Sequence, residues 1–169
     1  TRRSSDLNEL FKPSSLLQQH VEDNIKAIGG KYISATFRFQ QLLGDLIEGN
    51  YPVLNDSDKQ KLISKCQQQL DLLHKKYPNK TILVTADSNT FLASVKKMPY
   101  VYVIPGNVVH MDYISDASYT VYEKSFLDFL LIANADKVHL IYNRQMYKSG
   151  FPGLASKVHN KLYQEIFFE

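Results

Sequence analysis

The chain has 169 residues, of which 20 are Lys or Arg, 17 are Asp or Glu and one is Cys. This length suits one domain with a substantial core, and a net charge of +3 is too small to indicate by itself either nucleic acid or an anionic membrane as a partner. One Cys excludes an internal disulfide and a Cys-rich zinc site. No apolar run approaches the roughly 20 residues that span a bilayer, and no signal peptide opens the chain. The sequence therefore predicts a cytoplasmic protein with no membrane span.

The seven glycines form neither G-x-G-x-x-G nor G-x-x-x-x-G-K-[ST]. Both the usual dinucleotide fingerprint and the P-loop are therefore absent, which argues against NAD enzymes and P-loop NTPases. Other phosphate sites remain compatible with the sequence, because they do not need these motifs.

The predicted elements alternate between helix and strand. A polar and flexible N-terminus over residues 1–13 is expected to precede one domain over residues 14–169. Apolar residues spaced three and four apart predict five helices. The first helix runs from Ser14 or Ser15 to residue 28, and the second from a cap at Asp56 or Ser57 to just before Pro78. The third follows residues 86–89 and carries Phe91, Leu92 and Val95. The fourth covers residues 120–134, with Phe126, Phe129, Leu130 and Ala133 on one side, and the fifth runs from the loop 147–153 to about residue 161.

Strands are predicted where β-branched and aromatic residues cluster, over residues 31–39, 81–85, 100–104 and 137–142, with a short final strand at 162–168. This order implies a mostly parallel sheet with right-handed crossovers. The fold class is therefore α/β, a Rossmann-like three-layer sandwich. In such open sheets ligands bind outside the carboxyl ends of the strands.

The residues just after each predicted strand are polar and suit a ligand with phosphates and hydroxyls. They are Arg38 with the loop to Asp45, then Asp87 and Ser88, then His110 and Asp112, then residues 147–151. Arg38 can grip a phosphate with two hydrogen bonds. The amides of Ser149, Gly150 and Phe151, at a helix start, can bind another phosphate oxygen. Asp87 or Asp112 can accept hydrogen bonds from a base or ribose.

Structural roles compete with these functional ones. Arg38 is equally compatible with a solvated or ion-paired strand residue, and residues 87–88 read more readily as an ordinary helix N-cap. His110 and Asp112 form either an H-x-D metal pair or, more simply, part of a polar loop. Lys124 and Asp128, four residues apart on a helix, have the spacing of a surface ion pair.

Taken together, several segments resemble a bacterial glycosyltransferase family related to the fucosyltransferases. Residues 37–45 (FRFQQLLGD) resemble its phosphate-gripping segment, which reads H-x-R-[R]-x-D in fucosyltransferases, with Thr36 here at the His position and Phe39 where many have a second Arg. The other matching segments are residues 84–88 (VTADS), 103–106 (VIPG) with 110–112 (HMD), 124–129 (KSFLDF) with Ala133 and Ala135, and 147–155 (YKSGFPGLA). They are similar, in this order, to a strand-end T-D or S-D-S segment, the stretch after it, a K-x-x-x-D helix and an S-x-F-x-x-x-A nucleotide loop.

This resemblance, over about residues 30–160, implies the C-terminal, donor-binding domain of a GT-B glycosyltransferase. The fucosyltransferases that this chain resembles invert the anomeric centre and need no metal, so the resemblance implies inversion without a cofactor. The implied partners are a nucleotide-sugar donor, with GDP-fucose the leading candidate, a glycan acceptor such as bacterial surface polysaccharide, and the N-terminal acceptor domain of the same enzyme.

The resemblance also assigns roles to individual residues. Arg38 holds the donor β-phosphate. Asp45 or Glu48 either orients Arg38 or acts as the general base, and these three residues form the catalytic set. The donor-binding set is completed by Asp87, Ser88, His110, Asp112, Lys124, Asp128, Ser149, Gly150 and Phe151. Two alternatives stay open: a non-catalytic, flavodoxin-like interaction module, and a metal-dependent hydrolase that uses His110, Asp112 and Asp87.

Overall fold

A computed structural model describes residues 2–45, 49, 51–109 and 119–169. Its sheet has five strands in the order β3-β2-β1-β4-β5, and every pair of neighbours is parallel. The strands are β1 (Tyr32–Phe37), β2 (Thr81–Ala86), β3 (Val101–Tyr102), β4 (Lys137–Tyr142) and β5 (Leu162–Phe167). The predicted α/β fold with a parallel sheet is confirmed.

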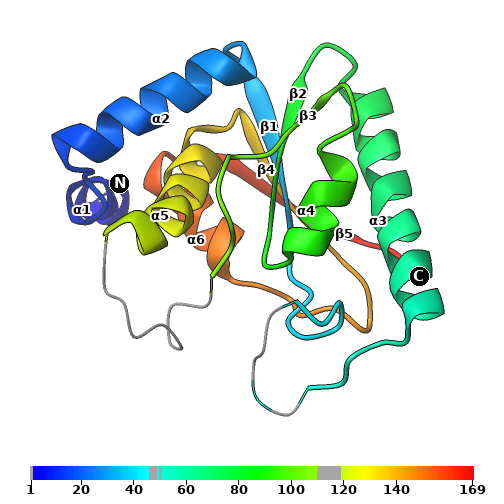
Figure 1. Ribbon diagram of the computed structural model, residues 1–169. Coiled ribbons are helices and arrows are strands. Elements are labelled where there is room, and N and C mark those ends of the chain that lie inside the picture. The colour runs from blue at the N-terminus through cyan, green and yellow to red at the C-terminus, as the bar shows by residue number, and fades with distance from the viewer. Residues whose placement is uncertain (1, 46–48, 50, 110–118) are drawn as a thin grey trace.

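Helices cover both faces of this sheet and complete the three layers (Figure 1). On one face lie α3 (Asp56–Lys76) and α4 (Asn89–Val95), and on the other lie α2 (Ser15–Ile28), α5 (Tyr119–Asn134) and α6 (Phe151–Val158). Helix α1 (Arg2–Leu10) lies beside α6. Each strand is preceded by a helix, so the helix-to-strand connections all meet at the amino edge of the sheet.

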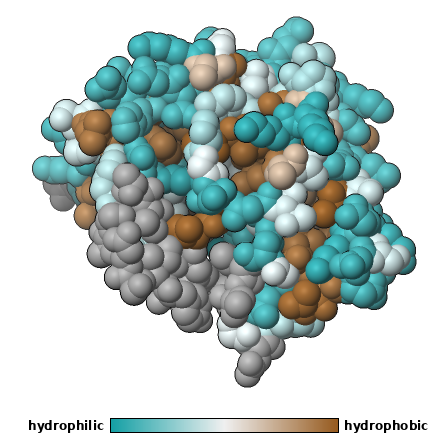
Figure 2. All heavy atoms as spheres, viewed as in Figure 1, coloured by the Kyte–Doolittle hydropathy of each residue, from teal (hydrophilic) through white to brown (hydrophobic). Residues whose placement is uncertain are grey.

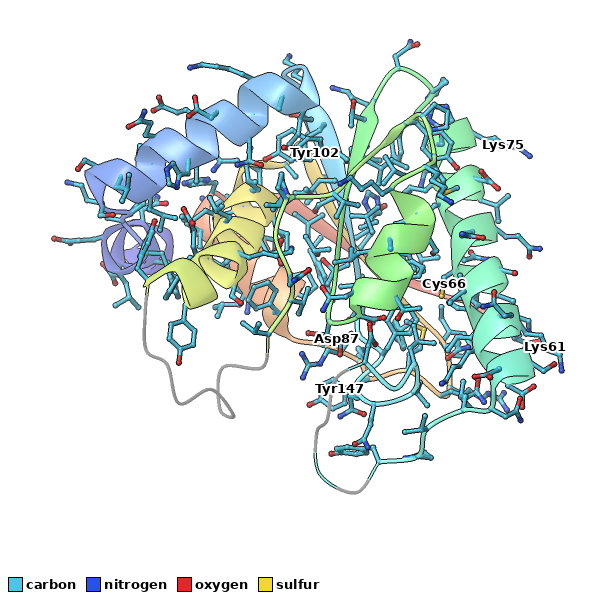
Figure 3. The ribbon with its side chains drawn as sticks, viewed as in Figure 1. Lys61, Cys66, Lys75, Asp87, Tyr102 and Tyr147 are labelled. Atoms are coloured by element: carbon cyan, nitrogen blue, oxygen red, sulfur yellow. The ribbon has the colours of Figure 1, made fainter. Side chains whose placement is uncertain are left out.

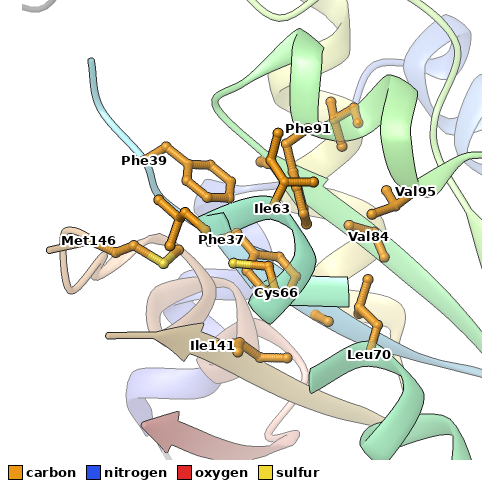
Figure 4. Close-up of a cluster of buried hydrophobic side chains, with 14 of the residues drawn as sticks. Phe37, Phe39, Ile63, Cys66, Leu70, Val84, Phe91, Val95, Ile141 and Met146 are labelled. Atoms are coloured by element: carbon orange, nitrogen blue, oxygen red, sulfur yellow. The ribbon is translucent and has the colours of Figure 1, made fainter. Parts of the chain in front are cut away.

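The core under α3 and α4 is aromatic near the carboxyl end of β1. The ring of Phe91 lies 4.8 Å from that of Phe37 and 4.8 Å from that of Phe39, measured between centroids. Cys66 packs in the same cluster (Figure 4) and is fully buried. Burial raises the pKa of its thiol to about 12, so Cys66 has the packing role that the sequence predicts.

Two details of the helices differ from the sequence predictions. Asn55 caps α3, because its side-chain oxygen accepts from the amide of Asp58, so the cap is one residue earlier than predicted. Phe126 is exposed rather than on the buried side of α5. The reason is helical geometry, since Phe126 lies two residues from both Lys124 and Asp128, and those two side chains face the interior.

The two ends of the chain also differ from expectation. The polar N-terminal stretch forms helix α1, which the sequence pattern does not indicate, and Phe11 after it packs on Phe129 at a centroid distance of 4.6 Å. Helix α6 ends at Val158, three residues before the predicted end. On the face shown in Figure 2, hydrophobic residues form small patches among hydrophilic ones.

His139 is a fully buried histidine in the middle of β4. Its Nδ1 lies 3.0 Å from the carbonyl oxygen of Ser34. Burial lowers the pKa of this ring, and the nearby charges of Lys76 and Lys137 lower it further, against the opposing effects of Ser34 and Gln164. The folded chain therefore favours the neutral ring.

We expect the chain to lose stability as the pH falls below 6.5, the ordinary pKa of histidine. The unfolded chain binds a proton at residue 139 in that range and the folded chain does not, so protonation favours unfolding, by up to about 1.4 kcal/mol per pH unit. Urea denaturation at several pH values measures this. His139→Asn keeps a donor for Ser34 but does not titrate, and its stability should depend less on pH than that of wild type. His159→Asn, at an exposed ring that also bonds a carbonyl oxygen, is the control.

Candidate functional site

The strand order places a topological switch point at the carboxyl ends of β1 and β4. From β1 the chain continues to β2 and β3 on one side, then returns to β4 on the other side of β1. Such a topological switch point is where open α/β sheets bind ligands. Arg38 directly follows β1, and Asn143 directly follows β4. The amide of Tyr147 donates to the carbonyl oxygen of Arg38 at 3.0 Å, which joins the two loops.

Asp87, directly after β2, holds the segment that contains Arg38. Its Oδ1 accepts from the amide of Phe39 at 2.7 Å and its Oδ2 from the amide of Gln40 at 2.7 Å. Gln40 has a φ of 53°, so its backbone is in the left-handed region. The two bonds stabilise this tight turn, which lies beside Asp87 and Tyr147 at the lower end of the sheet in Figure 3.

The same carboxylate also pairs with the Arg38 side chain. The distance from Arg38 Nε to Asp87 Oδ2 is 3.2 Å. Asp87 is only 6% exposed, and burial raises its pKa, while the amides of Phe39 and Gln40 and the Arg38 charge oppose that rise. The side chain of Arg38 is 32% exposed. Because a guanidinium is always charged and this one is partly open to solvent, Arg38 presents a cation that can bind a phosphate.

Asp45 and Ser88 hold the start of helix α4. The Ser88 hydroxyl donates to Asp45 Oδ2 at 3.0 Å and accepts from the amide of Phe91, while the amide of Thr90 donates to Asp45 Oδ2 at 2.6 Å. Ser88 is thus the N-cap of α4, which is the structural role foreseen for it. In the structure, Asp87 rather than Asp45 contacts and orients Arg38.

The Lys124–Asp128 pair on α5 is buried. Lys124 and Asp128 are 6% and 8% exposed, and the Lys124 ammonium lies 3.0 and 3.1 Å from the two oxygens of Asp128. Burial raises the pKa of Asp128, and Lys124 opposes that rise. The expectation of a surface ion pair is therefore wrong. The pair lies beneath the loop after β3. A Cβ atom added to Gly106 in that loop would lie 3.7 Å from the side chain of Lys124.

The segment 149–151 begins helix α6. Gly150 is its N-cap with φ −78°, no side chain caps the helix, and the space beside Gly150 is open. The amide of Phe151 donates to the Ser149 hydroxyl at 3.2 Å. Ser149 and Gly150 line one end of a cavity of about 640 Å³ that extends along α6 and β5, with Lys148 beside them.

Three predicted site residues, Glu48, His110 and Asp112, lie outside the described residues. Among the residues that are described, no three His, Cys, Asp or Glu side chains gather as a metal site would require. Both oxygens of Asp87 are already bonded, to Arg38 and to two amides, so the hydrolase alternative gains no support from this residue. No helix in the described part of the chain is long and apolar enough to cross a membrane.

Two asparagines shape this edge without having been predicted as site residues. The Asn89 side chain bonds both the amide and the carbonyl oxygen of Val108, which fixes the loop after β3. The Asn143 oxygen accepts from the amides of Gln145 and Met146, which turns the loop after β4 towards Arg38. An Asn at the end of a strand is a known turn signal, so the turn-forming role of Asn143 could have been predicted from the sequence.

Asp87→Asn should lower the free energy of unfolding by about 1–3 kcal/mol. An asparagine at this site places an NH₂ group against the amide of Phe39 or Gln40, so one buried donor loses its acceptor. The control is Asp56→Asn, because the side chain of Asp56 is fully exposed and an NH₂ group there is solvated by water. Urea denaturation compares the two variants, and equal losses would contradict the role given to Asp87.

Sequence comparison finds no matching family profile and no similar curated protein. Comparison with solved structures does find similar folds. The NodZ alpha-1,6-fucosyltransferase soaked with GDP-fucose superposes with a TM-score of 0.53 over 86% of this chain, and the same enzyme co-crystallized with GDP with 0.51 over 85%. The chain shares its fold with part of the fucosyltransferase NodZ. NodZ from Bradyrhizobium, in a further structure, gives a TM-score of 0.50.

The predicted resemblance to a fucosyltransferase-related GT-B domain is thus confirmed for the fold. The sequence identity to NodZ is only 14% in these three structures. The chain spans 41–42% of the NodZ chains, so it corresponds to less than half of that enzyme.

Proposed function

We propose that this chain is the donor-binding part of a glycosyltransferase that takes a nucleotide-sugar, with GDP-fucose the leading donor. The observation that carries the proposal is the position of Arg38. It follows the central strand β1 at the switch point of the sheet, and the buried carboxylate of Asp87 holds it there. An arginine fixed in this way suits the recognition of a diphosphate.

Arg38 would act on the leaving group. Breaking the bond between sugar and diphosphate leaves negative charge on the β-phosphate, and a cation already in place stabilises that charge without reorganisation. Asp87 is then a positioning residue, because its oxygens contact Arg38 and backbone amides. We assign the base or ribose of the donor to other groups than Asp87, which corrects the role implied by the family resemblance.

The start of α6 supplies a second place for phosphate. Helix N-termini favour anions, and the open space beside Gly150 leaves room for one. The loop before α6 is joined to the Arg38 backbone through Tyr147, so both anion-binding groups belong to one edge of the sheet. We place the diphosphate between Arg38 and residues 149–151.

The remaining parts of the reaction rest on the family resemblance. They are inversion at the anomeric centre, a glycan acceptor such as surface polysaccharide, and a second domain that holds it. We assign Asp45 to capping α4 and leave Glu48 as the candidate base of this chain, since Oδ2 of Asp45 already accepts from Ser88 and Thr90. The NodZ structures solved with GDP and with GDP-fucose support the choice of donor.

Calorimetric titration with GDP, GDP-fucose, UDP and a UDP-sugar tests this function. We expect saturable binding of GDP and GDP-fucose, and weaker binding of the uridine compounds. Preference for UDP would keep the glycosyltransferase assignment but replace the donor. No saturable binding by any of the four would contradict the proposed function and favour the interaction module.

A further inference from the structure

Lysines gather at the amino edge of the sheet, opposite the proposed donor site. Six of them lie in the helix-to-strand connections or at the first position of a strand, and together they represent all five strands. They are Lys31 before β1, Lys80 before β2, Lys96 and Lys97 before β3, Lys137 in β4 and Lys161 before β5.

Four more lysines reach the same edge from the last turns of helices. They are Lys26 of α2, Lys75 and Lys76 of α3, and Lys157 of α6. Cations in a last turn are favoured by the helix dipole, so these four have a structural explanation. Lys96 is the C-cap of α4 and shares this explanation. The other five lie in connections or begin a strand and have none of this kind, so the combined set needs a further explanation.

Carboxylates at this edge are few among the described residues. Asp136 pairs with Lys80 at 2.6 Å, Asp23 pairs with Lys26 at 3.5 Å, and Asp71 accepts from the hydroxyl of Tyr100. The whole chain has a net charge of only +3. Ten lysines against three carboxylates at one edge therefore mean that the rest of the chain is net negative, and the charge is strongly polarised.

The shape and chemistry of this lysine edge favour a broad anionic surface as its partner. Five strands about 4.8 Å apart make the edge about 20 Å wide, and helices on both faces of the sheet widen it in the other direction. All ten cations are lysines, which act as point charges, whereas arginine is preferred where phosphates are bound in a fixed geometry. The upper rim in Figure 2, which is this edge, is largely hydrophilic.

Two exposed leucines distinguish between a bilayer and a nucleic acid. Leu72 lies one turn before Lys75 on α3, and Leu162 directly follows Lys161. Apolar side chains beside lysines suit the interface of a lipid bilayer. The tyrosines of this edge are already engaged, because Tyr100 stacks on His74 and Tyr77 lies under Lys76 and Lys137. They are not available to stack on bases.

We propose that the lysine edge docks the protein on a bilayer surface rich in anionic lipid headgroups. Docking at this edge leaves the Arg38 edge on the far side, about 20 Å away along the six-residue strands. Vesicle binding and GDP binding are therefore expected to be independent, so this inference does not rest on the proposed function.

Co-sedimentation with vesicles tests the proposal. The vesicles contain phosphatidylcholine alone or with about one third phosphatidylserine. We expect binding to the mixed vesicles only, and weaker binding as salt is added. Each lysine removed should weaken binding about fivefold, so the double variants Lys75→Glu/Lys76→Glu and Lys96→Glu/Lys97→Glu should each bind more than tenfold more weakly.

The matched control is Lys61→Glu/Lys65→Glu, which makes the same change of charge in the first half of α3, away from the lysine edge. Figure 3 shows Lys61 and Lys75 at opposite ends of this helix. The control should bind the mixed vesicles like wild type. Circular dichroism checks that each variant folds. If the Lys75/Lys76 variant of α3 does not fold, the Lys96/Lys97 variant, on a separate loop, still tests the proposal. Three outcomes would overturn the proposal: no binding to mixed vesicles, an equal loss in the control, or binding to duplex or single-stranded DNA in place of vesicles.

Discussion

Arg38→Ala is expected to weaken GDP binding by roughly 10- to 150-fold, since a hydrogen-bonded interaction with a charged group contributes about 1.5–3 kcal/mol. The fold should survive the change, because Asp87 keeps its two bonds to the amides of Phe39 and Gln40. Calorimetry measures the affinity and urea denaturation the stability. Loss of affinity with little loss of stability is the expected combination.

Two further variants make the Arg38 experiment specific. Arg38→Lys keeps the charge but not the planar fork, so it should recover only part of the affinity. Arg144→Ala removes an exposed arginine from the loop after β4, at the same edge of the sheet, and should bind GDP like wild type. Wild-type affinity in Arg38→Ala would show that the phosphate is held elsewhere.

Lys124→Ala should destabilise the chain by about 3–5 kcal/mol, because it leaves the buried carboxylate of Asp128 without its cation. Burial already raises the pKa of Asp128, and removal of Lys124 takes away the opposing effect. A carboxyl with a raised pKa in the folded state stabilises that state more as the pH falls. The loss in the variant should therefore be smaller at about pH 5 than at about pH 8, as measured by urea denaturation.

The double variant Lys124→Met/Asp128→Leu separates the cost of an unpaired charge from that of lost packing. Replacing both members with apolar residues of similar size should restore most of the stability. Lys61→Ala breaks an exposed pair with Asp58 on α3 and should cost at most about 1 kcal/mol. If Lys124→Ala costs no more than Lys61→Ala, the buried pair has no structural role.

Local patterns of the sequence predict the fold well. The β-branched and aromatic runs locate all five strands, and the apolar spacing locates the helices from α2 to α6, because buried strands and amphipathic helices have distinct periods. The polar residues of α1 show no such period, so composition alone misses that helix. Strand β3 is short because only Val101 and Tyr102 pair with β2, although the apolar run extends to Ile104.

The site is harder to predict, because its contacts join distant parts of the chain. Sequence places Arg38 and Asp87 after their strands, but the bonds from Asp87 to Phe39 and Gln40 cross 48 and 47 residues. Spacing identifies Lys124 and Asp128 as neighbours on one helix face, yet it cannot tell whether that face is buried. The Asp45–Ser88 contact depends in the same way on the meeting of two loops.

The change in backbone amide NMR signals on titration with GDP tests where the diphosphate binds. If the diphosphate lies between Arg38 and the start of α6, the amides of Phe39 and Gln40 and those of Ser149, Gly150 and Phe151 should shift together and saturate at one affinity. Amides at the amino edge, such as those of Lys76 and Lys161, should not move. Saturable shifts confined to other parts of the sheet, or no shifts at all, would contradict a diphosphate site between Arg38 and α6.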